Sequence, residues 1–211
     1  MKVGVLIFPA VEELDFVGPW EMFGMWSLVT GRPAPLLVAQ TLDPVRCAKG
    51  MTVVPQHSFA DCPALDVLVV PGGQGTRSEV GNPLLIDFIA SRAQRARYVM
   101  SVCTGAFLLH KAGLLEGRRV TTHWASLDKL RQYGNVRVCE ERWVCDGDVW
   151  SSAGVSAGMD MVLEFISQTD SAVIAGKVQL AAEYYPEDKR HGGVLSHQQA
   201  PDYAQVIERG K

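Results

Sequence analysis

Apolar residues along this chain occur in short continuous runs that alternate with stretches of helical periodicity. Short apolar runs bounded by turn residues are typical of strands that are buried on both faces of a parallel sheet. A different pattern follows residue 135, where segments 136–138 and 142–144 are expected to pair with 148–150 around the turn at Asp146 and Gly147. The runs that predict the other strands are 3–8, 36–39, 66–70, 98–102 and 119–122.

Helical periodicity is clear where Leu84, Leu85, Phe88 and Ile89 recur between charged residues, which predicts an amphipathic helix. Capping residues and further apolar spacing predict the remaining helices. These are a helix from 106 to Gly113 or Gly117, one over 126–132 with Ser126 as N-cap, one over 158–168, and one from a cap at Asp170 to Leu180.

Strands that alternate with helices predict βαβ units, right-handed crossovers and a doubly wound α/β fold with a mostly parallel sheet. No internal repeat, low-complexity block or linker interrupts the pattern, so we predict one domain over 1–185. The polar segment 186–211 is expected to be a tail that is mobile or packs on a partner. Segments 15–30 and 150–158 are expected to be loops that form the walls of a pocket.

Composition narrows the class of protein. The chain has 211 residues, of which 47% are hydrophobic, so it can bury a large core and does not have the composition of a disordered protein. A formal net charge of −3 gives no reason to expect nucleic acid or an anionic membrane as a partner. The first apolar run is too short for a signal peptide, and no run of about 18 apolar residues predicts a membrane span. We therefore expect a cytoplasmic protein.

The five cysteines form no CxxC pair, so neither a disulfide framework nor a zinc ribbon is predicted. His57, His110, His191 and His197 show no ligand spacing, and we expect neither a metal nor a cofactor. An odd number of cysteines leaves at least one free thiol in a monomer. The thiols for which we expect ordinary packing or surface roles are Cys47, Cys62, Cys139 and Cys145.

The remaining thiol, Cys103, stands where a predicted buried strand turns into a helix. Ligands bind at the carboxyl ends of strands in open α/β sheets, and the turn is similar to a serine nucleophile elbow with sulfur in place of oxygen. The amides of Thr104 and Gly105 would lower the pKa of this thiol. Gly72 and Gly73, at another strand end, would bring N–H groups close to a developing negative charge. The alternative is that Cys103 is a small buried apolar residue.

Five motifs together resemble the ThiJ/PfpI superfamily. The resemblance extends over roughly residues 1–185 and implies a flavodoxin-like sandwich related to class I glutamine amidotransferases. Within the superfamily the motifs look most like isonitrile hydratases, and equally like the sensor half of arabinose-regulator-type transcription activators. Those activators carry a C-terminal helix-turn-helix domain, for which we expect no room in this chain. The motifs are LDFVGP at 14–19, VVPGG at 69–73, SVCTGAFLL at 101–109, TTHW at 121–124 and SAGVSAGMD at 152–160.

The resemblance implies an acidic residue from the first loop beside the elbow thiol, and Asp15 stands at that position. Its neutral carboxyl would donate a hydrogen bond to the thiolate and later act as an acid, because two close negative groups raise the pKa of a carboxyl. Thr104 replaces the His that follows the Cys in the protease-like branch. His123 is expected near the thiol in a structural or a catalytic role, and Trp20 and Val155 are candidate pocket walls.

Three functions follow from these observations. In an isonitrile hydratase, the Cys103 thiolate would attack the isocyanide carbon, Asp15 would protonate it to give a thioimidate, and water would release an N-substituted formamide. Amides of Thr104 and of Gly72 or Gly73 would stabilise the adduct. The alternatives are a glyoxalase or deglycase acting on methylglyoxal-type dicarbonyls, and a non-enzymatic thiol sensor or binding module. The superfamily is commonly homodimeric. Apolar residues that would form either an interface or the core are Phe16, Phe23 and Trp26.

Overall fold

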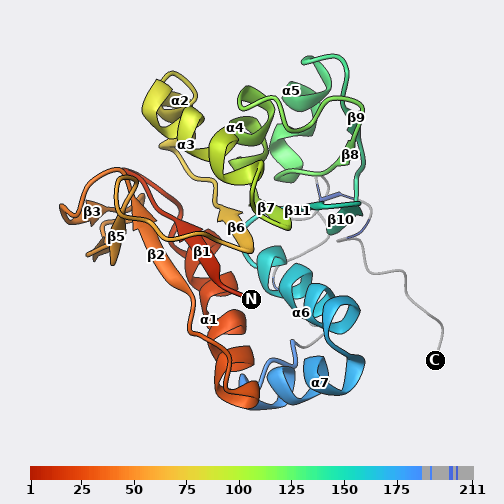
Figure 1. Ribbon diagram of the computed structural model, residues 1–211. Coiled ribbons are helices and arrows are strands. Elements are labelled where there is room, and N and C mark those ends of the chain that lie inside the picture. The colour runs from red at the N-terminus through yellow and green to blue at the C-terminus, as the bar shows by residue number, and fades with distance from the viewer. Residues whose placement is uncertain (187–190, 192–199, 202, 204–211) are drawn as a thin grey trace.

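The computed structural model describes residues 1–186, 191, 200, 201 and 203, and it shows a central sheet between two layers of helices (Figure 1). In this described part, seven strands form the sheet in the order β10-β11-β7-β6-β1-β2-β5, and β10 and β11 are the antiparallel pair. The predicted mostly parallel α/β fold is confirmed. The strands are β1 (Val3–Leu6), β2 (Leu36–Ala39), β5 (His57–Ser58), β6 (Val67–Val70), β7 (Tyr98–Val102), β10 (Trp143–Asp146) and β11 (Val149–Ser152).

The helices α1, α6 and α7 contact one another on one face of the sheet, and α2, α3 and α4 form the layer on the other face (Figure 1). Aromatic side chains fill the core under the first layer, where the ring centroids of Trp26 and Phe165 are 6.4 Å apart. No helix in the described residues is long and apolar enough to cross a membrane. The helices are α1 (Glu13–Thr30), α2 (Thr76–Glu79), α3 (Pro83–Ala93), α4 (Gly105–Lys111), α5 (Leu127–Arg131), α6 (Ala157–Thr169) and α7 (Ala172–Ala181).

The direction in which strands are added reverses beside β1. From β1 the chain passes through α1 to β2 on one side, whereas β6 and then β7 lie on the other side. Such a reversal opens a crevice at the carboxyl ends of the strands, where α/β proteins bind ligands. The segments that follow β1, β6 and β7 all reach this edge, and they carry Asp15, Gly72 and Cys103.

The loop predicted over 15–30 is wrong, because α1 occupies it. The central sheet and the helices α6 and α7 surround much of α1. Its apolar residues therefore lie on several sides of the helix and form no amphipathic stripe. Pro19 inside the helix adds a signal that normally argues against one. Phe16, Phe23 and Trp26 are buried, so they belong to the core and do not support an exposed interface.

Short strands also differ from the sequence prediction. Segment 136–138 does not join the pair formed by 142–144 and 148–150; it contributes β9, which pairs in parallel with β8 in a separate sheet. Another small ladder, between β3 and β4, was not predicted. Strands of two residues carry no measurable periodicity, so only their pairing reveals them. These strands are β3 (Val45–Arg46), β4 (Thr52–Val53), β8 (Arg119–Val120) and β9 (Arg137–Val138).

One of the two predicted helix caps is wrong. Ser171, rather than Asp170, caps α7, because its hydroxyl accepts a hydrogen bond from the Ile174 N–H. Asp170 instead accepts from the Trp26 indole N–H, 3.0 Å away. Ser126 is the N-cap residue of α5, as predicted, although its side chain makes no capping hydrogen bond.

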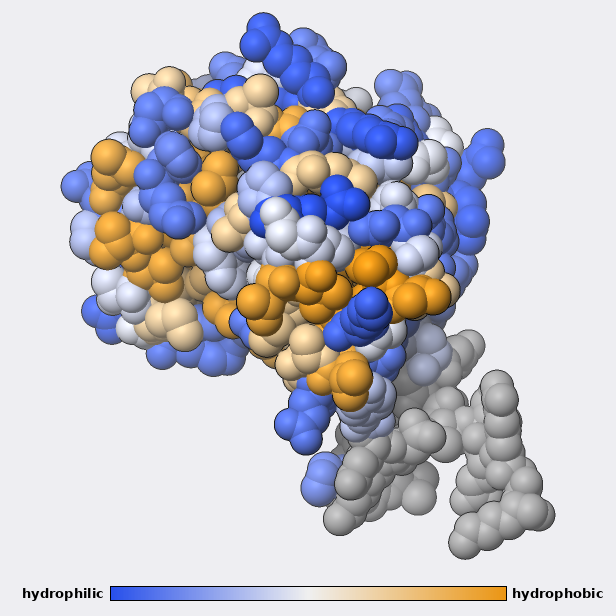
Figure 2. Space-filling view, turned by 60° about the horizontal axis from the view of Figure 1, so that its bottom comes forward, coloured by the Kyte–Doolittle hydropathy of each residue, from blue (hydrophilic) through white to orange (hydrophobic). Residues whose placement is uncertain are grey.

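The surface of the α1–α7 layer exposes Leu28, Val173 and Leu180, and Figure 2 shows apolar patches on the face that lies at the bottom of Figure 1. Homodimer formation stays a prediction. Most of the predicted tail, 186–211, lies outside the described residues, so its role and the boundary at 185 also stay predictions.

Candidate active site

Cys103 occupies the first position after β7 and has a φ of +56°, a left-handed conformation that is strained for a residue with a side chain. Its N–H donates to the carbonyl oxygens of Ser152 and Ala153, each 3.1 Å away. Its carbonyl oxygen accepts from the Thr122 hydroxyl at 2.7 Å. The surrounding backbone therefore holds the sharp turn that the sequence predicted, as in a nucleophile elbow.

Gly105 lets the elbow form close to the neighbouring strand. A Cβ at this position would collide with the carbonyl oxygen of Val70 at the end of β6. The first residue of α4 therefore has to lack a side chain for β6 and β7 to end side by side.

Asp15 lies in the first turn of α1 and is fully buried. One carboxyl oxygen, Oδ2, accepts from the Gly72 N–H at 3.0 Å, whereas Oδ1 is buried without a hydrogen-bond partner. The thiol of Cys103 and the backbone of Val155 are close enough to influence the pKa of this carboxyl. The structure thus brings together the acidic residue and the thiol that the resemblance paired, although Asp15 is helical and not in a loop.

Burial raises the pKa of Asp15 from 3.8 to about 7, because the protein interior disfavours the charged carboxylate. The Gly72 amide, and after it the Cys103 thiol and the Val155 backbone, lower the pKa but do not outweigh burial. Near neutral pH this carboxyl can therefore both accept and donate a proton.

The expected lowering of the thiol pKa is wrong. Burial, and then the adjacent negative charge of Asp15, raise the pKa of Cys103 to about 12. The Thr104 amide favours the thiolate, as predicted, but its effect is smaller than these two. The two groups consequently share one proton between pH about 7 and about 12.

Two of the three amides expected to stabilise an adduct, those of Gly72 and Gly73, are already engaged. The Gly72 N–H bonds to Asp15, and the Gly73 N–H donates to Thr104 Oγ1 at 3.0 Å. Their role in this structure is to orient the acid and the residue after the thiol. The N–H groups nearest the sulfur belong to Thr104 and Val155, and both lower the pKa of the thiol.

His123 packs against the backbone of Gly154, where a Cβ would collide with its ring. Nδ1 accepts a hydrogen bond from the Ala125 N–H at 3.2 Å, which leaves the proton of the neutral ring on Nε2. Burial lowers the pKa of this histidine, so it is neutral at pH 7. This hydrogen bond from the neighbouring backbone suits a structural role, but the residue also lines the cavity described next.

A cavity of about 270 Å³ opens above the thiol. Asp15 does not line this cavity. Trp20 is also absent from its walls and packs against the core instead, so the prediction for Trp20 is wrong. Several wall residues were not predicted from the sequence. They follow strand ends or flank the motifs, and the strand-end rule could have found them. The lining residues are Glu12, Gly73, Gln74, Arg77, Cys103, Thr104, His123, Ala125, Ser126 and Val155.

No group of three or more His, Cys, Asp or Glu side chains that could hold a metal occurs among the described residues. Cys47 and Cys62 are buried, and Cys139 and Cys145 are partly exposed. None of these four lines the cavity above Cys103.

Comparison with known proteins agrees with the motifs. The sequence profile of the DJ-1/PfpI family matches residues 1–168. This chain belongs to the DJ-1/PfpI family. A DJ-1/PfpI relative named isonitrile hydratase, from Pseudomonas putida, is 40% identical over 186 residues, which cover 88% of this chain and 79% of that protein. The predicted family membership is confirmed.

Two further relatives show the range of this family. The crystal structure of a ThiJ/PfpI family protein from Pseudomonas syringae is 35% identical, with a TM-score of 0.84 and coverage of 92% of this chain and 79% of the other. The HTH-type transcriptional regulator GbdR of Pseudomonas aeruginosa is 26% identical over 79% of this chain, which spans 46% of that regulator's length. Segments similar to this chain thus occur both in a protein named as an enzyme and in one named as a transcriptional regulator.

Proposed function

We propose that this protein hydrates an isocyanide to an N-substituted formamide. The observation that carries the proposal is the buried pair of Asp15 and Cys103, of which Cys103 lines a cavity of about 270 Å³. The relative named isonitrile hydratase, 40% identical over most of the chain, supports the choice of substrate class. A nucleophile and a proton carrier that share one proton are the groups this reaction requires.

The first half-reaction joins the substrate to the thiol. As Cys103 Sγ attacks the terminal carbon of R–N≡C, the thiol proton passes to Asp15 and a C–S bond forms. The carbon now holds a lone pair, to which Asp15 returns the same proton. The product is the thioimidate R–N=CH–S–Cys103, and no external acid or base is consumed.

The second half-reaction releases the product. Water adds across the C=N bond, with Asp15 accepting a proton from the oxygen as it attacks and passing it to the nitrogen. The hydroxyl proton of the resulting R–NH–CH(OH)–S–Cys103 then returns to sulfur through Asp15 as the C–S bond breaks. The formamide R–NH–CHO leaves, and the pair again holds one proton.

The direct test is to incubate the full chain with an aryl isocyanide and to measure the formamide by chromatography and mass spectrometry. Turnover is expected in the wild type and in Cys139→Ala, whose thiol lies away from the cavity. Cys103→Ala should abolish turnover, and Asp15→Asn should reduce it by about 10²–10⁴-fold. In D₂O the formyl carbon should carry deuterium. Undiminished turnover in Cys103→Ala would reject the proposal.

Burial disfavours the sensor alternative, because thiol oxidation requires exposure and thiolate character, and Cys103 is 7% exposed with a raised pKa. The glyoxalase alternative is tested by offering methylglyoxal beside the isocyanide. Consumption of methylglyoxal alone, dependent on Cys103, would replace the hydratase proposal with the glyoxalase function.

A further inference from the structure

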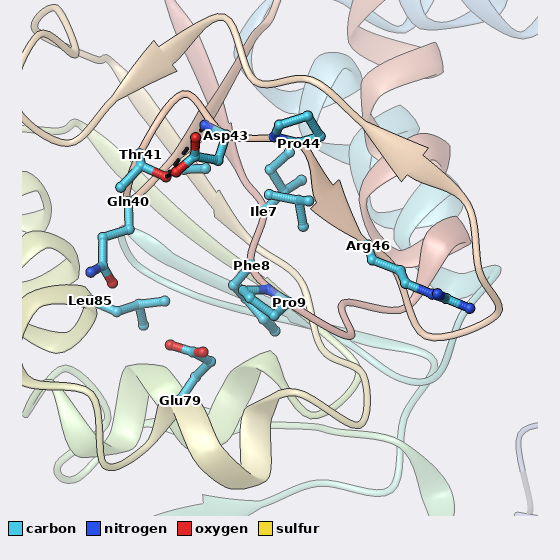
Figure 3. A pocket seen from close by; sticks show the side chains of 12 residues that line it. Ile7, Phe8, Pro9, Gln40, Thr41, Asp43, Pro44, Arg46, Glu79 and Leu85 are labelled. Atoms are coloured by element: carbon cyan, nitrogen blue, oxygen red, sulfur yellow. Dashed lines mark hydrogen bonds between the residues drawn. The ribbon is translucent and has the colours of Figure 1, made fainter.

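A second cavity, of about 430 Å³, lies at the carboxyl ends of β1 and β2 (Figure 3). Its walls are mainly apolar, and its volume falls in the range of sites that hold small organic molecules. The lining residues are Ile7, Phe8, Pro9, Ala39, Gln40, Thr41, Asp43, Pro44, Val45, Arg46, Glu79 and Leu85.

This cavity is separate from the one above the thiol. The two cavities share no lining residue. The short helix α2 borders both cavities, because Arg77 lines the cavity above the thiol and Glu79 lines the second one. A ligand in the second cavity would therefore not touch Cys103.

Glu79 is the polar centre of the second cavity. The residue is 9% exposed, and Figure 3 shows its carboxylate pointing into the space between Phe8 and Leu85. Asn82 donates to Oε2 at 2.7 Å, and no Lys, Arg or His side chain in the described residues forms an ion pair with Glu79. A buried carboxylate with one hydrogen bond retains acceptor positions that the protein does not fill.

The residues around Glu79 leave its carboxylate in need of a further hydrogen-bond donor. Asn82 also donates to Gln40 Oε1, 2.9 Å away, so its amide is fixed and brings no second donor to the carboxylate. Arg46 is exposed and points away from Glu79 in Figure 3, whereas Asp43 adds a second carboxylate near the mouth.

We propose that this cavity binds a small organic cation, namely an ammonium group with an aromatic or branched aliphatic body. The ammonium would donate to Glu79 at the polar end, and the body would pack against Phe8 and Leu85. The positive charge of the ligand would balance the buried carboxylate, and its apolar body would suit the apolar walls. The site is independent of the reaction proposed for Cys103.

Isothermal titration calorimetry with two probes of the same shape tests the proposal. The full-length chain is titrated with 2-phenylethylammonium and with 2-phenylethanol, which lacks the charge. The ammonium should bind at least about 10-fold more tightly, the effect of one charged hydrogen bond. Glu79→Gln should remove this preference, whereas Glu21→Gln, a matched change at an exposed position of α1, should preserve it.

Further variants keep the test decisive. Cys103→Ala should bind the ammonium unchanged, which separates this site from the proposed hydratase activity. Thr41→Trp, at the exposed rim, should weaken both probes and serves if Glu79→Gln fails to fold. The proposal would be overturned if about 10 mM ammonium gave no heat of binding, or if the two probes bound with equal affinity. It would also be overturned if folded Glu79→Gln retained the preference for the ammonium, or if folded Thr41→Trp bound the probes fully.

Discussion

The backbone N–H of Gly72 donates to Oδ2 of Asp15 across 3.0 Å and so joins the end of β6 to the first turn of α1. A Cβ at position 72 would lie 2.5 Å from the Thr104 nitrogen and 2.9 Å from Asp15 Oδ2. Only glycine lets the strand end approach the acid and the elbow together. The orientation of the carboxyl beside Cys103 depends on this contact.

Gly72→Ala is therefore expected to move Asp15 away from the thiol. We predict a fall in kcat/KM of at least about 10²-fold, because a small displacement of a catalytic group has large kinetic effects. Overpacking should also lower the free energy of unfolding by about 1–3 kcal/mol. Gly24→Ala is the control, since a Cβ there meets open space in α1, and it should keep full activity and stability.

The pH dependence of kcat/KM should report the raised pKa of Asp15. Below pH about 7 both groups of the pair are protonated, so no base is present to take the thiol proton. Activity should fall about tenfold per pH unit on the acidic side and stay flat from pH 8 to pH 10. Initial rates in constant-ionic-strength buffers provide the measurement. A midpoint near pH 4 would mean that Asp15 does not control the rate.

The same pKa shift predicts that Asp15→Asn stabilises the protein at alkaline pH. A folded-state pKa of about 7 against an ordinary value of 3.8 means that the folded state binds the Asp15 proton more tightly than the unfolded state. Wild-type stability therefore falls as pH rises from about 4 to about 7, by up to about 4 kcal/mol at about 1.4 kcal/mol per pKa unit.

Urea unfolding of both proteins at pH 4 and pH 8 measures this difference. Asp15→Asn should gain about 1–4 kcal/mol relative to the wild type at pH 8, with the gain shrinking toward pH 4. An equal difference at both values would show that the carboxyl is not destabilised by burial.

Thr122→Val removes the hydroxyl that donates to the carbonyl oxygen of Cys103. The two side chains have the same shape, so the expected loss of about 1–3 kcal/mol in unfolding free energy reflects one buried carbonyl left without a partner. We also expect a lower kcat, because the elbow is less firmly held. Thr30→Val removes a similar hydroxyl-to-carbonyl bond at the far end of α1 and should leave kcat unchanged.

The pattern of apolar and polar residues predicted the helices and strands whose residues all lie in the same kind of environment. The strands at 67–70 and 98–102 are buried on both faces and read as continuous apolar runs, which placed Cys103 at a strand end. Helix α1 was missed because its apolar residues are buried on several sides and because it contains Pro19, a residue that normally argues against a helix. Short strands such as β8 and β9 depend on pairing partners far along the chain.

The positions of the candidate site residues were predicted better than their pKa values. The strand-end rule located Cys103, and family resemblance supplied Asp15, whose place beside the thiol depends on how α1 packs. The pKa of the thiol was predicted in the wrong direction, because sequence shows the nearby amides but not the extent of burial or the charge of Asp15. The role of the Gly72 amide likewise depends on a contact between residues 57 positions apart.

The left-handed backbone at Cys103 has a consequence for protein engineering. This conformation and the buried carboxyl of Asp15 both lower stability, and each can be relieved by one substitution, to Gly at 103 and to Asn at 15. A library selected for heat resistance alone would therefore enrich variants that have lost both reactive groups. Selection for a more robust protein has to include a readout of catalysis in every round.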